Sequence, residues 1–206
     1  MKKQWNAEEK LQFETALKAK GYQYIAGVDE VGRGPLAGPV VCAAVIMPLE
    51  FDKLVIGVDD SKKLSEKKRE LLSKEILEKA VCYSIVEVDE KQIDEINILE
   101  ATKLGMKRAI ESLSICPDMV LTDGNMTIDI SNPQQSVIGG DALSYSIGAA
   151  SIIAKVYRDH KMEEYAKLYP AYAFDKNKGY GTAVHIAAIK EQGLCPIHRR
   201  TFTKNF

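Results

Sequence analysis

Blocks of apolar residues alternate with mixed polar segments along the chain, and their spacing predicts strands and helices in turn. Five segments have the apolar or β-branched character of strands: 22–28, 40–46, 81–88, 119–121 and 137–138. The turn-prone Gly32-Arg33-Gly34-Pro35 lies between the first two, so we expect these strands to be neighbours in one sheet.

Apolar residues at intervals of three and four predict helices in the remaining segments. The predicted helices cover about 6–20, 64–80, 97–113, 144–168 and 182–192. The first half of 144–168 is apolar enough to be buried, whereas 64–80 carries Lys and Glu along one face and is expected at the surface.

Strands followed by helices, then strands and helices again, predict an α/β fold with a central mixed β-sheet flanked by helices. No internal repeat or low-complexity linker divides the chain, and 206 residues with 46% hydrophobic content suit one sizeable core. We therefore expect a single domain over 1–206, with a short N-terminal helix at about 6–20 and a C-terminal helical appendage at about 170–206.

The charges of the chain nearly cancel, because 28 Lys and Arg residues face 29 Asp and Glu residues. Any site for a polyanion must therefore be local. The four cysteines include no C-x-x-C pair, which argues against a zinc site or a disulfide framework. The apolar stretch 35–48 is too short to span a bilayer, and the start of the chain is too polar for a signal peptide. These features predict a soluble, cytoplasmic protein without a membrane partner.

Acidic residues follow three of the predicted strands. Asp29 and Glu30 end the first strand, Asp123 ends the fourth, and Asp141 follows the fifth after Gly139-Gly140. Each has a structural alternative, namely a strand-to-turn junction, an Asp-Gly-Asn turn or a helix cap. Carboxylates that meet at one sheet edge would repel one another without cations, and Mg²⁺ or Mn²⁺ prefer carboxylate oxygens. The joint pattern therefore predicts a divalent metal site.

Two glycine-containing loops carry residues that suit a sugar-phosphate backbone. Gly32 and Gly34 let the backbone approach a ligand closely, and Arg33 offers a planar donor fork to a phosphate or to the acidic residues. Lys178 and Tyr180 place a cation and an aromatic ring in the second loop. The alternatives are a tight turn for the first loop and a packing role for Tyr180.

Basic residues form two local clusters that can contact phosphate. They are His198-Arg199-Arg200 with Lys204, and Lys62-Lys63 with Lys67-Lys68-Arg69. For the second cluster a solvated surface face is the stronger alternative. His185 and His198 have no Ser or Cys partner at a recognisable motif, which argues against a nucleophilic triad.

Read in order, these segments resemble the ribonuclease HII family from about Tyr24 to Phe202. The matching segments are Asp29-Glu30-Val31-Gly32-Arg33-Gly34-Pro35-Leu36-Ala37-Gly38-Pro39, Asp60-Ser61-Lys62-Lys63-Leu64, Asn97-Ile98-Leu99, Asp123-Gly124-Asn125, Ala149-Ala150-Ser151-Ile152-Ile153-Ala154-Lys155 with Arg158-Asp159, Lys178-Gly179-Tyr180 and His198-Arg199-Arg200. The resemblance implies a ribonuclease H-like fold whose C-terminal helical region helps to embrace the substrate. It also implies an endonuclease that hydrolyses the RNA strand of RNA/DNA hybrids and nicks duplex DNA 5′ to embedded ribonucleotides.

The same resemblance assigns roles to the candidate residues. The family's acidic quartet, which holds Mn²⁺ or Mg²⁺, matches Asp29, Glu30, Asp123 and Asp141. The segment Gly32-Arg33-Gly34 would read the ribose 2′-hydroxyl and Tyr180 would pack on the following sugar, with Lys178 beside it, because the 2′-hydroxyl distinguishes RNA from DNA. Two ions roughly 4 Å apart would support in-line hydrolysis that leaves 5′-phosphate and 3′-hydroxyl ends.

The sequence departs from the family pattern directly after the last acidic residue. Ala142-Leu143-Ser144-Tyr145 stand where many family members have a basic residue, so phosphate contacts are not expected from this segment. Asp159 is an outside candidate for the site, but its neighbour Arg158 favours a salt bridge.

The expected partners are RNA/DNA hybrids and duplex DNA that contains ribonucleotides, and the expected state is a monomer. One competing hypothesis is another ribonuclease H-like enzyme, such as a junction nuclease or a transposase-type enzyme, but the Gly-Arg-Gly and Tyr180 loops favour ribonucleotide recognition. The other is a non-catalytic hybrid-binding module, and four clustered acidic residues argue against a pure binder of polyanions.

Overall fold

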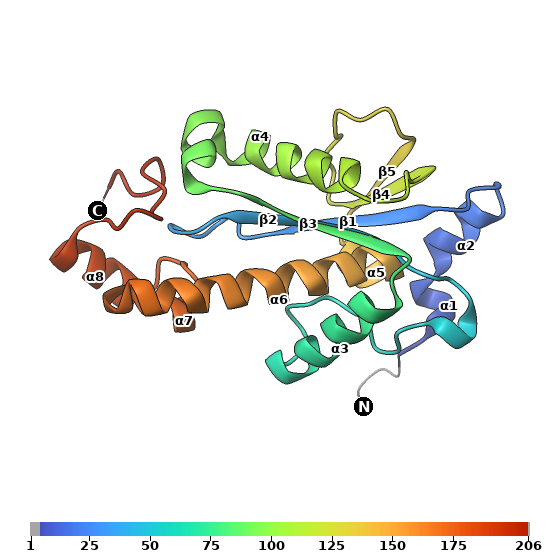
Figure 1. Cartoon of the computed structure of the whole chain (residues 1–206), viewed down its shortest axis with the longest axis horizontal. Coiled ribbons are helices and arrows are strands. Elements are labelled where there is room, and N and C mark those ends of the chain that lie inside the picture. Colours follow the sequence, from blue (N-terminus) through green and yellow to red (C-terminus); the bar gives the residue numbers. More distant parts are fainter. Residues whose placement is uncertain (1–4, 206) are drawn as a thin grey trace.

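A computed structural model describes residues 5–205, so the N-terminal Met1-Lys2-Lys3 lies outside the described residues (Figure 1). Five strands form one sheet in the order β3-β2-β1-β4-β5. Their bounds are Ile25–Val31 (β1), Val40–Ile46 (β2), Cys82–Val88 (β3), Met119–Asp123 (β4) and Gln134–Val137 (β5). β1 pairs antiparallel with β2 and parallel with β4, so the sheet is mixed and its first two strands are neighbours, as predicted.

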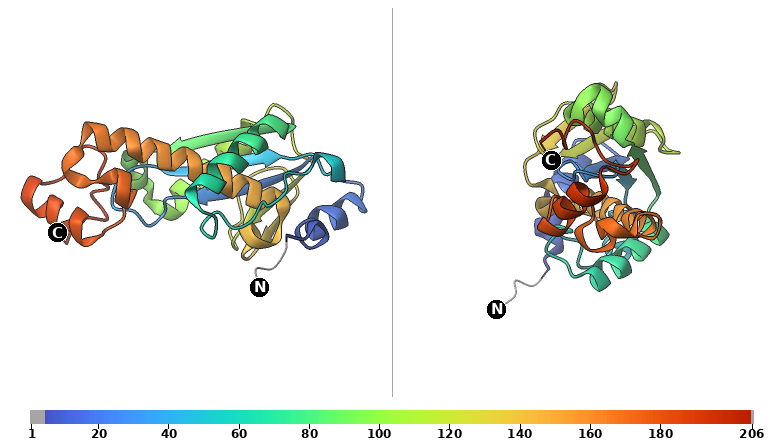
Figure 2. Two further views of the ribbon diagram at one scale, coloured as in Figure 1. Left: turned by 90° about the horizontal axis from the view of Figure 1, so that it is seen from below. Right: turned by 90° about the vertical axis from the view of Figure 1, so that its left-hand side faces the viewer.

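Helices cover both faces of this sheet. The α-helices are Ala7–Lys10 (α1), Gln12–Lys18 (α2), Glu66–Lys79 (α3), Glu90–Glu111 (α4), Gly140–Leu143 (α5), Tyr145–Leu168 (α6), Phe174–Asn177 (α7) and Ala183–Gln192 (α8), and the 3-10 helices are Phe51–Lys53 (η1) and Pro170–Tyr172 (η2). α4 lies on one face, α6 lies on the other face, and α3 packs against the outer side of α6 (Figure 1). α8 and the N-terminal helices lie at opposite ends of the long axis (Figure 2).

β1 extends three residues beyond its predicted end. Asp29 and Glu30 pair with Ala43 and Cys42 of β2, so both acidic residues lie within the strand rather than after it. The antiparallel partner keeps the backbone extended up to Val31, which hydropathy alone could not indicate because two charged residues interrupt the apolar run.

α6 crosses directly over the middle of β1, and this close approach requires a glycine in the strand. A Cβ atom on Gly27 would lie 2.1 Å from the backbone carbon of Ser146. Ser144 caps α6, and its hydroxyl donates a 2.6 Å hydrogen bond to the buried Glu14 of α2. The N-terminal helices therefore hold the start of α6 against the sheet.

α4 differs from the prediction at its start. We expected a helix from Asn97, whereas the helical segment begins at Glu90 and is interrupted at Asn97, where φ is 66°. The Asn97 side-chain oxygen accepts hydrogen bonds from the backbone nitrogens of Leu99 and Glu100, so the expected start is the cap of the second half of the helix.

Smaller differences concern the ends of the chain and the last strand. The predicted helix at about 6–20 is divided into α1 and α2, and β5 lies at Gln134–Val137 rather than 137–138. The region after Leu168 packs into an apolar cluster around Phe174 that also includes Ala37 and Met162, in agreement with the predicted C-terminal helical region. None of the helices within 5–205 is long and apolar enough to cross a membrane.

Candidate active site

The parallel pairing of β1 with β4 brings the first acidic residues together. Val28 pairs with Thr122, so Asp29 and Asp123 occupy the next positions on adjacent strands. Asp29 is only 5% exposed, and its side chain accepts a hydrogen bond from Ser151 of α6. The sheet and α6 therefore fix these two carboxylates at one edge.

The third segment reaches the same edge through a backbone hydrogen bond. The Gly140 nitrogen donates to Oδ1 of Asp123 over 2.7 Å, which places the start of α5 beside β4. The next residue, Asp141, is 9% exposed. The structure thus brings together the four acidic residues that the sequence singled out.

Burial and nearby negative charge make Asp29, Glu30 and Asp141 hard to ionise without a cation. Burial raises the pKa of Asp29 well above its usual value, and the charges of Glu30 and Asp123 raise it further. Burial also raises the pKa of Glu30 to about 6, although the Arg33 guanidinium partly lowers it. The pKa of Asp141 is raised by burial and then by the charge of Asp123. A cation between these groups would stabilise their charged forms.

The donor set fits a divalent cation in chemistry and charge. Oε2 of Glu30 is buried without a hydrogen-bond partner in the described part of the chain, and a carboxylate oxygen is a suitable ligand for Mg²⁺ or Mn²⁺. Within 5–205, no three acidic, histidine or cysteine side chains are already arranged to hold an ion. Binding therefore requires the carboxylates to turn toward one another.

Three further residues lie beside the carboxylates, and none of them has a role at the acidic site in the sequence analysis. Burial lowers the pKa of Lys62, but Asp141 and Asp29 raise it more, so the net shift is upward and places this cation beside the carboxylates. The hydroxyls of Ser61 and Ser151 lie 2.9 Å apart. The serine in the apolar first half of α6 gave no signal of its own, whereas Lys62 was named in a basic cluster that can contact phosphate, for which a solvated surface face was the stronger alternative.

The two glycine-containing loops meet beside the acidic residues. Gly32 has a φ of 91°, and a Cβ atom there would lie 2.2 Å from Nε of Arg158, so this position requires glycine. The Tyr180 ring packs against Gly34, because a Cβ on that glycine would lie 3.6 Å from the ring. Tyr180 is 47% exposed and lines a pocket of about 300 Å³ together with Asp29 and Glu30.

Comparison with known proteins agrees with this arrangement over most of the chain. The sequence model of a family described as ribonuclease HII matches residues 26–205. The chain belongs to the ribonuclease HII family. It is 58% identical to the ribonuclease HII of Ligilactobacillus salivarius over 94% of this chain and 77% of that protein. It is 54% identical to that of Caldicellulosiruptor saccharolyticus over 96% of both proteins.

Solved structures place this ribonuclease HII chain in the same fold. The crystal structure of ribonuclease H2 from Pyrococcus horikoshii superimposes with a TM-score of 0.72 and 29% identity, over 87% of this chain and 93% of the other. The chain therefore has the ribonuclease H-like fold of a family of nucleases.

In this family member, several predicted contacts are already occupied within the protein. The Lys178 ammonium lies 2.7 Å from a carboxylate oxygen of Glu163. The backbone carbonyl of Lys178 accepts a hydrogen bond from Arg158. His198 and Arg199 are buried, so the prediction that this part of the C-terminal basic cluster contacts phosphate is wrong for them. The predicted salt bridge between Asp159 and Arg158 is also not formed, since Asp159 pairs with Lys155 at 2.5 Å and with Arg69 at 3.7 Å.

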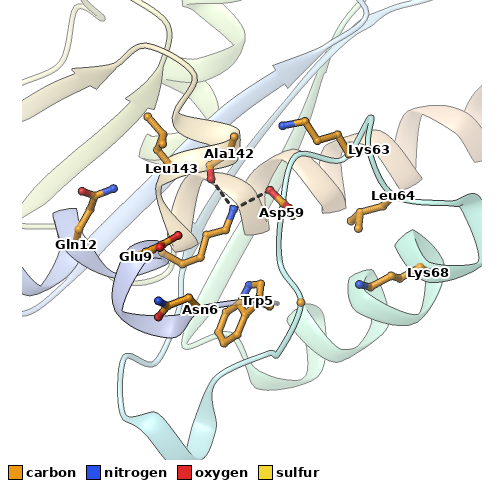
Figure 3. Close-up of a pocket in the computed structure, with 12 residues that line it drawn as sticks. Trp5, Asn6, Glu9, Gln12, Asp59, Lys63, Leu64, Lys68, Ala142 and Leu143 are labelled. Carbon is orange, nitrogen blue, oxygen red and sulfur yellow. Dashed lines mark hydrogen bonds and ion pairs between the residues drawn. The ribbon is translucent and has the colours of Figure 1, made fainter. Parts of the chain in front are cut away.

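A second cleft, of about 500 Å³, lies between the N-terminal helices, the loop before α3 and the segment that follows Asp141 (Figure 3). Lys10 is one of the residues that line it, and its ammonium donates hydrogen bonds to Asp59 and to the carbonyl of Ala142. This lysine therefore connects α1 to α5 and to the loop before α3.

Proposed function

We propose that this protein hydrolyses the RNA strand of RNA/DNA hybrids and nicks duplex DNA 5′ to embedded ribonucleotides. The observation that carries the proposal is the meeting of four acidic side chains with the Gly32-Arg33-Gly34 loop and Tyr180. Family membership supports the nuclease activity, and the neighbouring loops support recognition of the ribose.

Each part of the chain has a defined task in this proposal. Asp29, Glu30, Asp123 and Asp141 would hold divalent Mn²⁺ or Mg²⁺, which supplies charge stabilisation and lowers the pKa of an attacking water. Backbone groups of Gly32 and Gly34 would contact the 2′-hydroxyl, and Tyr180 would pack on the next sugar. Lys62 would add positive charge for the phosphate.

The direct test is cleavage of an end-labelled DNA duplex that contains one ribonucleotide, beside an all-DNA duplex, with Mg²⁺, Mn²⁺ or EDTA. We expect a metal-dependent nick 5′ to the ribonucleotide with 5′-phosphate and 3′-hydroxyl ends, and no cut in the control. Binding without a nick in either metal would support a non-catalytic binding module instead.

A substitution of one carboxylate tests the site itself. Asp29→Asn keeps the size of the side chain but removes its charge, so we expect cleavage to fall by more than about 100-fold, since even outer partners of metal ligands cost 10–100-fold. Hybrid binding, measured by fluorescence anisotropy, should persist. The matched control is Asp52→Asn at an exposed position in η1, which should leave cleavage unchanged. Unchanged cleavage by the Asp29 variant would refute the assignment.

A further inference from the structure

Two buried histidines form hydrogen bonds that support the loop that carries Tyr180. Nδ1 of His185 lies 2.9 Å from the Tyr180 carbonyl oxygen, and its Nε2 lies 3.0 Å from Nε2 of His198. Nδ1 of His198 accepts a 2.9 Å hydrogen bond from the backbone nitrogen of Cys195. The two rings therefore connect the Tyr180 loop to the segment 195–198.

The hydrogen-bond partners of the two histidine rings determine which nitrogen of each ring carries a proton. A carbonyl oxygen only accepts, so His185 must carry its proton on Nδ1, which leaves its Nε2 as an acceptor. His198 must then donate from its own Nε2, and its Nδ1 is free to accept from Cys195. The Cys195 carbonyl oxygen also lies 3.3 Å from Nδ1 of His198, but it already accepts from the His198 backbone nitrogen over 3.1 Å. The shorter contacts of both rings are satisfied together when both rings are neutral and hold opposite tautomers.

The surroundings favour this neutral arrangement. His185 is 0% exposed and His198 is 3% exposed. The ring of Tyr172 meets both histidines edge-on, and Phe174 packs beside them. Burial lowers the pKa of both histidines, so neither is charged near neutral pH.

Arg199, the residue after His198, contacts the Gly32-Arg33-Gly34 loop. The Arg199 guanidinium donates to the carbonyl oxygens of Gly32 and Arg33 over 2.6 and 2.9 Å. The short segment 195–199 therefore contacts the Gly32-Arg33-Gly34 loop directly through Arg199 and the Tyr180 loop through His185, and it links the positions of the two loops.

We propose that His185 and His198 are positioning residues for ribonucleotide recognition, and that they fix the Tyr180 backbone relative to the Gly32-Arg33-Gly34 loop. This inference rests on the proposed function, because it assigns the histidines to the discrimination between a ribonucleotide embedded in DNA and a continuous hybrid. Neither histidine touches the substrate in this proposal.

Two substitutions of one residue separate positioning from packing. In His198→Asn the amide oxygen replaces Nδ1 and still accepts from Cys195, but the side chain is too short to reach His185. In His198→Gln the amide nitrogen replaces Nε2 and still donates to His185. The readout is kcat/KM on a duplex with one embedded ribonucleotide divided by kcat/KM on a uniform RNA/DNA hybrid, measured on folded protein.

We expect His198→Asn to lower this ratio roughly threefold to tenfold, the loss that corresponds to one hydrogen bond, and His198→Gln to keep it near the unsubstituted value. Tyr180→Ala should lower the same ratio, and adding His198→Asn to it should have no further effect. Tyr172→Phe is the matched control, because it removes a hydrogen bond to Gly193 in the same aromatic cluster. It leaves unchanged the hydrogen bonds that connect His198 through His185 to Tyr180.

Equal losses on both substrates in His198→Asn and Tyr172→Phe would overturn the inference and leave the proposed function standing. Failure of the unsubstituted protein to cut either substrate would instead refute the proposed function. If His198→Asn does not fold, nitrogen NMR of the unsubstituted protein measures the tautomer and the charge of the two histidine rings instead. Opposite neutral tautomers support the inference, and identical tautomers or a charged ring overturn it.

Discussion

The pKa values of single residues at the acidic edge are set first by burial and then by the charges of their neighbours. Arg33 lies 3.5 Å from Glu30, and this guanidinium limits the rise of the Glu30 pKa, which still reaches about 6. The sequence left open whether Arg33 meets a phosphate or the acidic residues, because its distance from Glu30 depends on the tight turn at Gly32. It also missed Ser151, since a serine in an apolar helix gives no sign of the carboxylate that it will meet.

Removal of the Arg33 charge should change the pH dependence of cleavage. Glu30 must lose its proton to bind a cation, so activity should rise with pH through the Glu30 pKa. In Arg33→Leu that pKa rises further. We therefore expect the acidic limb of the pH profile of the cleavage rate to move to higher pH by roughly half a unit to one unit. The measurement is single-turnover cleavage between pH 5 and 8 at limiting Mn²⁺. Arg33→Lys keeps the charge and should keep the limb near its original position, whereas an unmoved limb in Arg33→Leu would contradict this role.

At the scale of elements, the order of strands and helices was predictable, but their junctions were not. The pattern of apolar residues located α3, α6 and α8 to within two residues, because each begins with a capping Ser or Thr. It failed at α4, where Asn97 caps a helix that has already begun. It also missed α5, a single turn that depends on the contact between Gly140 and Asp123.

The crossing of α6 over β1 gives a test at this scale. In Gly27→Ala the new methyl group would meet the backbone of Ser146 and Ile147 at 2.1–2.5 Å, and backbone cannot move aside easily. We expect a loss of about 3 kcal/mol or more in the free energy of unfolding, measured by denaturant titration. Gly139→Ala, at a left-handed site with a φ of 68° and a ψ of 30° and open space around the new atom, should cost only about 1 kcal/mol. Equal costs would show that α6 can shift away from the sheet.

Across the whole molecule, the sequence predicted the layered fold but not how its C-terminal region is fastened to it. We expected His198-Arg199-Arg200 to contact phosphate, whereas Arg199 is fully buried and binds backbone carbonyls at the end of β1 and in the following loop. Arg158 makes similar contacts from α6 to Pro39 and Lys178. Hydropathy assigns such arginines to the surface, because carbonyl partners leave no mark in the sequence.

The buried histidines should make the stability of the whole molecule fall at acidic pH. Burial, with a further contribution from His185, lowers the pKa of His198 to about 4, whereas the unfolded chain binds the proton near 6.5. The unfolded state therefore takes up protons first, and the stabilisation that is present above pH 6.5 is lost as the pH falls toward 4. His198 alone accounts for about 3 kcal/mol of this loss.

Unfolding by urea at several pH values measures this effect. His198→Gln cannot be protonated, so the free energy of unfolding of the unsubstituted protein should approach that of the variant as the pH falls from 7 to 4. Parallel pH profiles of the two proteins would mean that His198 is charged in the folded state.

Arg158 and Arg199 also have an electrostatic consequence for a chain whose net charge is only −1. Burial lowers the pKa of Arg158 to about 10 and that of Arg199 to about 9, so both remain charged at neutral pH, and in the described part of the chain neither forms an ion pair. Counterions screen buried charges much less than surface lysines. We therefore expect a positive potential beneath the loops that carry Gly32 and Tyr180 that persists in salt, and under the proposed function it would draw a phosphate backbone toward the edge where four carboxylates would otherwise repel it.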